Sequence, residues 1–255
     1  YYASRGLGDV YKRQVMYGGY GYYGLGYSLF DPTMILVYIG ALLSLWASSK
    51  VNSTFQRYSR VRSMTGMTGA EAAKRLLQSQ GIYDVTVQPV RGQLTDHYDP
   101  RTKTVNLSES VYGSTSIAAV GVAAHECGHA IQDNVGYAPL RLRSAFVPIA
   151  NFGSKISLPL IILGFFIGLT PFIEIGIWMF VLAVLFQIIT LPVEFNASSR
   201  AVHLVDSLGI LQGDEVDGTR KVLGAAALTY VAAAAASILQ LARLIILFGG
   251  RRRND

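Results

Sequence analysis

The chain has 255 residues, of which 51% are hydrophobic and only 15% are charged. Soluble domains carry about 25% charged residues, so this composition predicts a membrane protein. The basic residues behind the net charge of +6 cluster beside apolar segments, which indicates membrane orientation and lipid contact, and the chain has no nucleic-acid-binding motif. The single cysteine excludes intrachain disulfides.

Residues 1–30 differ in composition from the rest of the chain. The segment Asp9–Gln14 is what one reading frame of a transposase mosaic-end sequencing adapter would encode. We interpret residues 1–14 as an assembly artefact and leave them out of the fold prediction. Residues 15–30 are rich in Tyr and Gly, and two interpretations stay open for them: an aromatic belt at the membrane interface, or a disordered tail.

An apolar segment at residues 31–49 predicts the first transmembrane helix. Asp31 and Pro32 open it, because proline is favoured in the first helical turn. The segment approaches the ~20 residues that are needed to cross a bilayer. Lys50 and Arg57 come directly after it, so the positive-inside rule puts this end of the helix in the cytoplasm.

We expect residues 50–150 to form a cytoplasmic catalytic region. A capping box at Thr68–Glu71 predicts a helix over residues 67–81. Alternating apolar residues predict strands at 83–89, 93–97 and 104–107, with a turn at 99–103. We expect Thr102–Leu107 to be an edge strand that receives the substrate as an added strand.

His125, Glu126 and His129 form the motif His-Glu-x-x-His. On an α-helix, residues i and i+4 lie on one face, so both imidazoles can bind one zinc ion. Glu126 is rotated about 100° from His125 and can act as the general base for a zinc-activated water. Apolar residues at 116–124 predict a buried helix, and Cys127 is predicted to be a buried apolar residue on its opposite side.

Residues 151–191 predict a transmembrane hairpin with spans at 156–169 and 172–191. The connecting loop has no Lys or Arg, whereas both outer flanks do, so the hairpin leaves the cytoplasm and returns to it. Before the hairpin, Leu140–Arg143 alternates apolar and basic residues, as a juxtamembrane segment facing anionic lipid would.

Residues 192–221 carry Glu194 back to the cytoplasmic membrane surface, the side on which the His-Glu-x-x-His helix lies. A catalytic zinc site typically has three protein ligands plus water, so Glu194 is a candidate third ligand. The alternative is a solvated carboxylate at a helix start, where it favours the helix dipole. The residues alone leave both interpretations open.

Residues 222–249 form a fourth apolar helix that is rich in alanine and long enough to span. If it spans, the Arg run at 251–253 lies outside, against the positive-inside rule. The alternatives are a helix along the membrane or one packed on the catalytic region, and we favour the span.

His97 also has two interpretations. It could stabilise the tetrahedral intermediate of hydrolysis, or it could cap a strand turn beside Asp96 and Asp99. Geometry decides such assignments, and we favour the structural role.

With His125–His129 and Leu191–Ser198 both in view, the chain resembles the YugP-type neutral zinc metallopeptidases of bacterial membranes. The resemblance runs from about Asp31 to Phe248 and includes Met67–Glu71, Leu94–Arg101 and Ala226–Val231. The order of parts, with a membrane hairpin between the two ligand segments, is similar to that of the HtpX-type proteases.

The resemblance implies a gluzincin-like site in which His125, His129 and Glu194 hold one Zn²⁺ ion and Glu126 is the general base. HtpX-type proteins have an aspartate four residues after the ligand glutamate, where this chain has Ser198.

A hydrogen-bond partner is expected for each ligand histidine. Ser198, Asn196 and Asp133 are candidates that the sequence does not rank, and His203 receives no role.

We therefore expect an α-helical membrane protein with a small α+β zincin-like catalytic domain and three to four transmembrane helices. The predicted function is a zinc endopeptidase of the bacterial cell membrane that acts on polypeptides near or in the lipid bilayer, with its site facing the cytoplasm. Two alternatives are a membrane protein with a structural zinc site, and a zinc hydrolase of a non-peptide substrate such as a lipid head group. The oligomeric state is not predicted.

Overall fold

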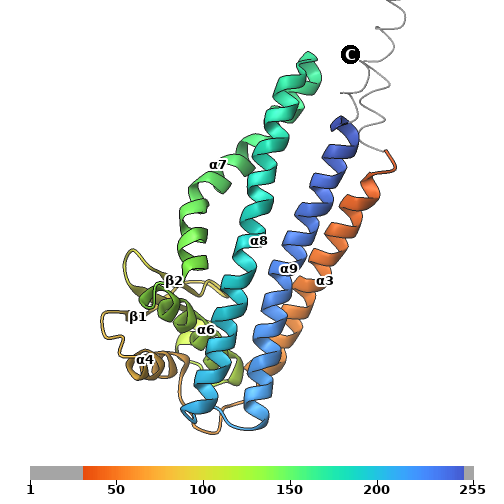
Figure 1. Ribbon diagram of the computed structural model, residues 1–255. Coiled ribbons are helices and arrows are strands. Elements are labelled where there is room, and N and C mark those ends of the chain that lie inside the picture. Colours follow the sequence, from red (N-terminus) through yellow and green to blue (C-terminus); the bar gives the residue numbers. More distant parts are fainter. Residues whose placement is uncertain (1–30, 250–255) are drawn as a thin grey trace, which may run out of the picture.

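The computed structural model describes residues 31–249, so the predictions for residues 1–14, 15–30 and 251–253 lie outside the described residues. The described part is mostly helical. Long helices lie side by side, and a small region of short helices and strands covers one end of them (Figure 1).

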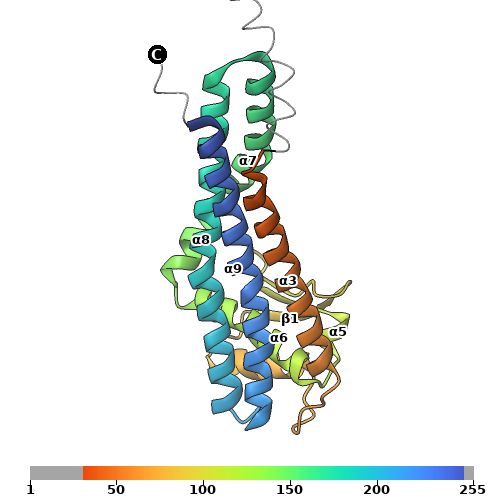
Figure 2. The ribbon, with the colours of Figure 1, turned by 90° about the vertical axis from the view of Figure 1, so that its right-hand side faces the viewer.

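Four helices of this part are long and apolar enough to cross a membrane by length and composition: α3 (Met34–Ser59), α7 (Ala138–Ile167), α8 (Thr170–Ser207) and α9 (Asp214–Phe248). The apolar segment at 222–249 therefore belongs to a fourth candidate span. Helices α3 and α9 run side by side in both views (Figures 1 and 2).

The far end of the α3–α9 pair is held by a largely buried ion pair. Arg243 Nη2 lies 3.1 Å from Asp31 Oδ2, at the end of the helices that is remote from the strands (Figure 1). The other carboxylate oxygen of Asp31 accepts a hydrogen bond from the backbone N–H of Thr33, at 2.7 Å. Asp31 thus holds the turn that leads into α3, whose N-cap is Thr33, so the helix begins just after the predicted opening at Asp31 and Pro32.

Helices α7 and α8 form the predicted hairpin and pack along their length. Gly168 closes it with a φ of +72°, which glycine adopts without strain. Both helices are longer than the predicted spans, because Pro148 and Pro159 lie inside α7, and Pro192 inside α8, without ending them. Residue 191 is therefore not the end of an element, and α7 bends in Figure 1 as interior prolines favour.

The α+β region begins with α4 (Gly69–Ser79). The Thr68 side chain accepts a hydrogen bond from the backbone N–H of Glu71. The Glu71 side chain in turn accepts one from the backbone N–H of Thr68. This is the capping box that the sequence predicts. Gly81, with a φ of +70°, lies just beyond the helix end.

The sheet has strands β1 (Thr86–Val90), β2 (His97–Asp99) and β3 (Thr104–Ser108) in the order β1-β3-β2. Strand β3 pairs in parallel with β1 and in antiparallel with β2. The prediction that Thr102–Leu107 is an edge strand is therefore wrong. A tight turn folds β2 back onto one side of β3, and β1 takes the other side.

The strand predicted at 93–97 is also displaced. Gly92 and Leu94 have φ values of +110° and +55°, which interrupt an extended backbone, so β2 begins only at His97.

The motif helix is α6 (Ile117–Asn134), which comes after the short helix α5 (Glu109–Tyr112). The Ser116 side chain caps it by accepting a hydrogen bond from Ala119 N–H. Helix α6 packs against α4, α8 and α9, and most of its residues are buried. Cys127 is fully buried, with its thiol 3.5 Å from the carbonyl oxygen of Ala73, as predicted.

Candidate metal centre

Helix α6 places the two motif histidines next to each other. The rings of His125 and His129 lie with their centroids 4.7 Å apart and their planes nearly perpendicular. Between them, Gly128 lets α6 approach α8 closely, because a Cβ atom added there would lie 2.6 Å from the carbonyl oxygen of Ala197. The missing side chain therefore brings the histidines up to α8.

Glu194 reaches the histidines from the middle of α8. Its Oε2 lies 3.3 Å from His125 Nε2 and 3.6 Å from His129 Nε2. The residue is only 2% exposed. The alternative of a solvated carboxylate at a helix start is therefore wrong, because α8 continues through Pro192 and buries Glu194 against α6.

These three atoms fit a zinc ion. Ligands at 2.0–2.2 Å from a tetrahedral ion lie about 3.4 Å from each other, close to the two observed distances. Glu194 Oε2 is buried and has no hydrogen-bond partner, although an unpaired buried carboxylate oxygen is costly. Two imidazoles and a carboxylate are also a donor set that zinc prefers. His125, His129 and Glu194 could therefore hold a metal ion.

The local electrostatics favour a cation. Burial lowers the pKa of His129, but the interaction with Glu194 and the negative charges of Glu126 and Glu194 outweigh it, so the pKa is raised above its ordinary value. Glu126 is buried on the same helix. The two carboxylates create a negative potential that a divalent ion would neutralise.

The second ring nitrogen of each histidine has a partner. His125 Nδ1 lies 3.1 Å from Ser198 Oγ, and His129 Nδ1 lies 3.0 Å from Gln132 Oε1. Of the three predicted candidates, only Ser198 contacts a ligand histidine directly. Asn196 contacts the partner of His129 instead, because it accepts a hydrogen bond from Gln132 Nε2 at 3.0 Å.

Gln132 is a partner that sequence reasoning missed. It is buried three residues after His129, and residues i and i+3 are neighbours on a helix, so its spacing is a usable signal. Its Nε2 also donates to the carbonyl oxygen of Val193, at 2.8 Å. Gln132 therefore ties His129 to the turn of α8 that carries Glu194.

Asp133 serves a different purpose from the one predicted. It accepts hydrogen bonds from Lys103 Nζ at 2.6 Å and from the Tyr98 hydroxyl at 2.8 Å. Burial raises the pKa of Asp133, but these hydrogen bonds and the charge of Lys103 outweigh it and lower the pKa. Asp133 thereby fixes the sheet to the motif helix.

Arg143 is a further residue that the sequence does not assign to the site. Its Nη1 lies 3.4 Å from Glu194 Oε1. The alternating pattern at 140–143 predicts a contact with anionic lipid, but the partner of Arg143 is this carboxylate. The sequence pattern cannot distinguish a lipid contact from this ion pair, because it does not show which face of α7 meets α8.

The two remaining histidines lie outside the metal-ligand group. His97 is exposed on β2, with Nδ1 2.8 Å from the carbonyl oxygen of Thr95, which supports the structural interpretation. His203 lines an open groove between α8 and α9, together with Asp206 and Arg220.

Two comparisons with known proteins found a match. A family model described as "Putative neutral zinc metallopeptidase" matches residues 33–249. The chain is 50% identical over 222 residues to a protein of Bacillus subtilis (strain 168) named "Putative membrane protease YugP", covering 86% of this chain and 99% of that protein. No solved structure matches the chain, so the zincin-like fold of the α+β region stays a prediction.

Proposed function

Because the chain belongs to the neutral zinc metallopeptidase family, we propose that it is a membrane-bound zinc endopeptidase whose site lies at the cytoplasmic membrane face. The convergence of His125, His129 and Glu194 at distances that suit one tetrahedral ion carries this proposal. In the described part of the chain, this group contains no fourth His, Cys, Asp or Glu. Three protein ligands favour a catalytic over a structural zinc site, since structural sites have four.

The hydrogen bonds around His129 define its tautomer. Gln132 Nε2 donates to Val193 O and Asn196 Oδ1, so Gln132 Oε1 is the amide atom that faces His129 Nδ1. An amide oxygen only accepts, and Nδ1 must therefore carry the proton. The lone pair on Nε2 is then free to bind a metal.

A bound zinc ion would supply Lewis acidity, which lowers the pKa of a water molecule from 15.7 to about 7. Glu126 would serve as the general base, accepting a proton from the attacking water and passing it to the leaving amine. Glu126 is buried on the motif helix, next in the chain to the ligand candidate His125.

One of the two free edges of the sheet supports a polypeptide substrate. Strand β2 pairs with β3 on one side only, in the sheet that the structure describes. Tyr98 of this strand is hydrogen-bonded to Asp133 of the motif helix. We propose that an extended peptide adds to β2 and so runs alongside the metal centre.

Helix length supports a site at the membrane surface. At a rise of about 1.5 Å per residue, the stretch of α8 from Thr170 to Glu194 is about 36 Å long. The hydrocarbon core of a bilayer is about 30 Å thick. If α8 enters the core near Thr170, Glu194 lies just beyond its opposite boundary.

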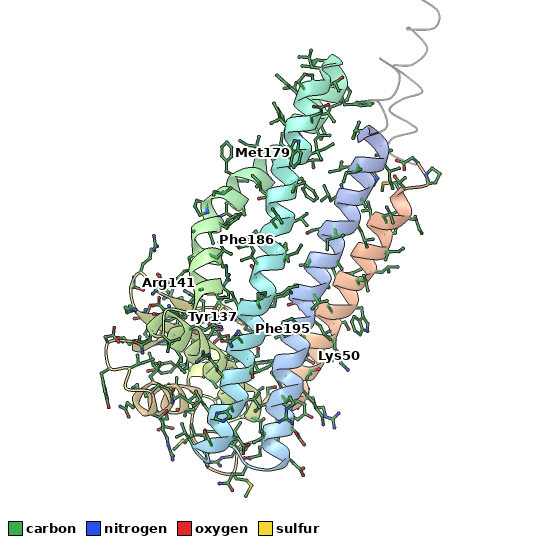
Figure 3. The ribbon with its side chains drawn as sticks, in the orientation of Figure 1. Lys50, Tyr137, Arg141, Met179, Phe186 and Phe195 are labelled. Atoms are coloured by element: carbon green, nitrogen blue, oxygen red, sulfur yellow. The ribbon has the colours of Figure 1, made fainter. Side chains whose placement is uncertain are left out.

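The basic residues support a cytoplasmic orientation. Lys50 lies toward the α+β end of α3 and Arg141 lies at the start of α7. The apolar Met179 and Phe186 lie nearer the hairpin tip, on the first half of α8 (Figure 3). The positive-inside rule places the basic end, and with it the metal centre, in the cytoplasm.

The substitution Glu126→Gln tests the mechanism. It keeps the size of the side chain but removes the proton acceptor, so the variant should bind zinc like the wild type and lose peptide hydrolysis by about 10²–10⁴-fold. Purified protein would be assayed on a peptide library and on phospholipid vesicles. Undiminished peptide turnover by the variant would contradict the mechanism. Turnover of lipid alone would favour a non-peptide hydrolase, and a zinc ion with four protein ligands would favour a structural role.

A further inference from the structure

We propose that Arg143 is a positioning residue that holds the Glu194 carboxylate in the orientation in which it binds zinc. The inference rests on the zinc site of the proposed function and extends it to α7, which carries none of the three ligands. The α7–α8 hairpin would then supply both the ligand Glu194 and the positive charge of Arg143 that pairs with it.

The two oxygens of Glu194 have different partners. Oε2 faces His125 and His129, whereas Oε1 lies 3.4 Å from Arg143 Nη1. The terminal torsion of a glutamate side chain is broad and has no strong intrinsic preference. A charged contact on Oε1 therefore selects the rotation in which Oε2 points at the imidazoles.

An arginine suits this position. Glu194 is almost fully buried, whereas the Arg143 side chain is 30% exposed, so the arginine reaches a buried carboxylate from a partly exposed position. Its planar, rigid array of donors fixes the plane of a carboxylate, which the compact ammonium group of lysine does not.

The hairpin sets the two residues at the same level. Arg143 and Glu194 stand almost equally far along the chain from the turn between α7 and α8, one before it and one after it. The helices are in close contact between these points. A Cβ atom added at Gly153 would lie 2.7 Å from Met179 O, and one added at Gly176 would lie 2.8 Å from Ser157 O. This close packing fixes the register of Arg143 against Glu194.

Arg143 has two effects of opposite sign on a metal ion. It orients the ligand, which raises zinc affinity, and its positive charge repels the ion, which lowers it. Removal of the guanidinium therefore distinguishes the two. A loss of affinity indicates positioning, and a gain indicates that repulsion dominates.

The test measures zinc affinity of the metal-free, full-length protein in detergent micelles, by competition with a chromophoric chelator. Arg143→Gln should weaken zinc binding about 10–100-fold, as loss of a residue that orients a metal ligand does. Arg143→Lys should restore part of this loss. Arg141→Gln is the matched control, because it makes the same change on the preceding arginine of α7 at an exposed position, and its affinity should equal that of the wild type.

The absorption spectrum of the cobalt-substituted protein gives a second readout, because its intensity depends on coordination geometry. It should change in Arg143→Gln and not in Arg141→Gln. If Arg143→Gln binds zinc with an affinity within twofold of the wild type, or more tightly, the inference is overturned. The zinc site itself would still stand. If this variant does not fold, Arg143→Lys decides: affinity below that of Arg141→Gln supports positioning, and equal affinity overturns it. A wild type that binds no zinc would contradict the proposed function itself.

Discussion

At the scale of single residues, the metal centre divides into a local part and an assembled part. His125, Glu126 and His129 lie at helical spacing, so the sequence predicts their relation directly. Glu194 lies in the second helix of the hairpin, far from His129 in the sequence, and only the count of zinc ligands and a family resemblance point to it. The sequence does not predict the contacts of Gln132 and Arg143 with the site, because a hydrogen bond or an ion pair depends on which faces of the helices meet.

Ser198 offers a test at this scale with a neighbour as control. Ser198→Ala removes the hydroxyl that lies 3.1 Å from His125 Nδ1, so the ring loses the contact that orients it. We expect zinc affinity to fall by about tenfold. Ser199→Ala removes the same group from an exposed position next to it and should leave the affinity unchanged.

Titration of zinc into both metal-free proteins, with calorimetric detection, measures the difference. Equal affinities of the two variants would show that Ser198 does not orient His125.

At the scale of secondary-structure elements, the helices are predictable and the sheet is not. Apolar length predicts the candidate spans, and the capping box at Thr68–Glu71 marks α4 correctly, because these signals are local. Strand β3 is central, whereas the order of the elements along the chain favours an edge. Strand order depends on how distant segments pair, and three short strands of similar pattern do not encode it.

Gly128 tests how the elements assemble the site. Gly128→Ala places a methyl group 2.6 Å from Ala197 O, which forces α6 away from α8 and the histidines away from Glu194. We expect a loss of about 1–3 kcal/mol in the free energy of unfolding, as overpacking costs, together with weaker zinc binding.

Gly224→Ala is the matched control, because it is also helical and an added Cβ atom would meet nothing within 4 Å. It should stabilise the protein by about 0.5–1 kcal/mol, since alanine favours a helix over glycine. Thermal unfolding of both metal-free variants in micelles checks the two signs. A Gly128→Ala variant as stable as Gly224→Ala would contradict the close contact between α6 and α8.

At the scale of the whole molecule, four candidate spans of the described part carry the candidate metal centre toward one end. Composition predicts this class of protein, because a 15% content of charged residues leaves too few to cover a soluble fold of this size. The sequence does not predict how these helices are arranged in space. The pairing of α3 with α9, and the ion pair of Asp31 with Arg243, join the two ends of the described chain.

The orientation in the membrane can be tested with introduced cysteines. The one native cysteine, Cys127, is fully buried and gives little background. Tyr83 of the α+β region is 80% exposed, and Leu169 at the tip of the hairpin is 46% exposed. A membrane-impermeant maleimide should label Leu169→Cys in intact spheroplasts and Tyr83→Cys only after lysis. The reverse pattern would place the metal centre outside the cell.

A structure of the zinc-bound protein would show whether one zinc ion joins the motif helix to the α7–α8 hairpin. We predict an ion about 2.0–2.1 Å from the Nε2 atoms of His125 and His129 and about 2.0–2.2 Å from an oxygen of Glu194, with one position left to solvent. A zinc ion that the histidines bind without Glu194, or one enclosed by a fourth protein ligand, would contradict this prediction.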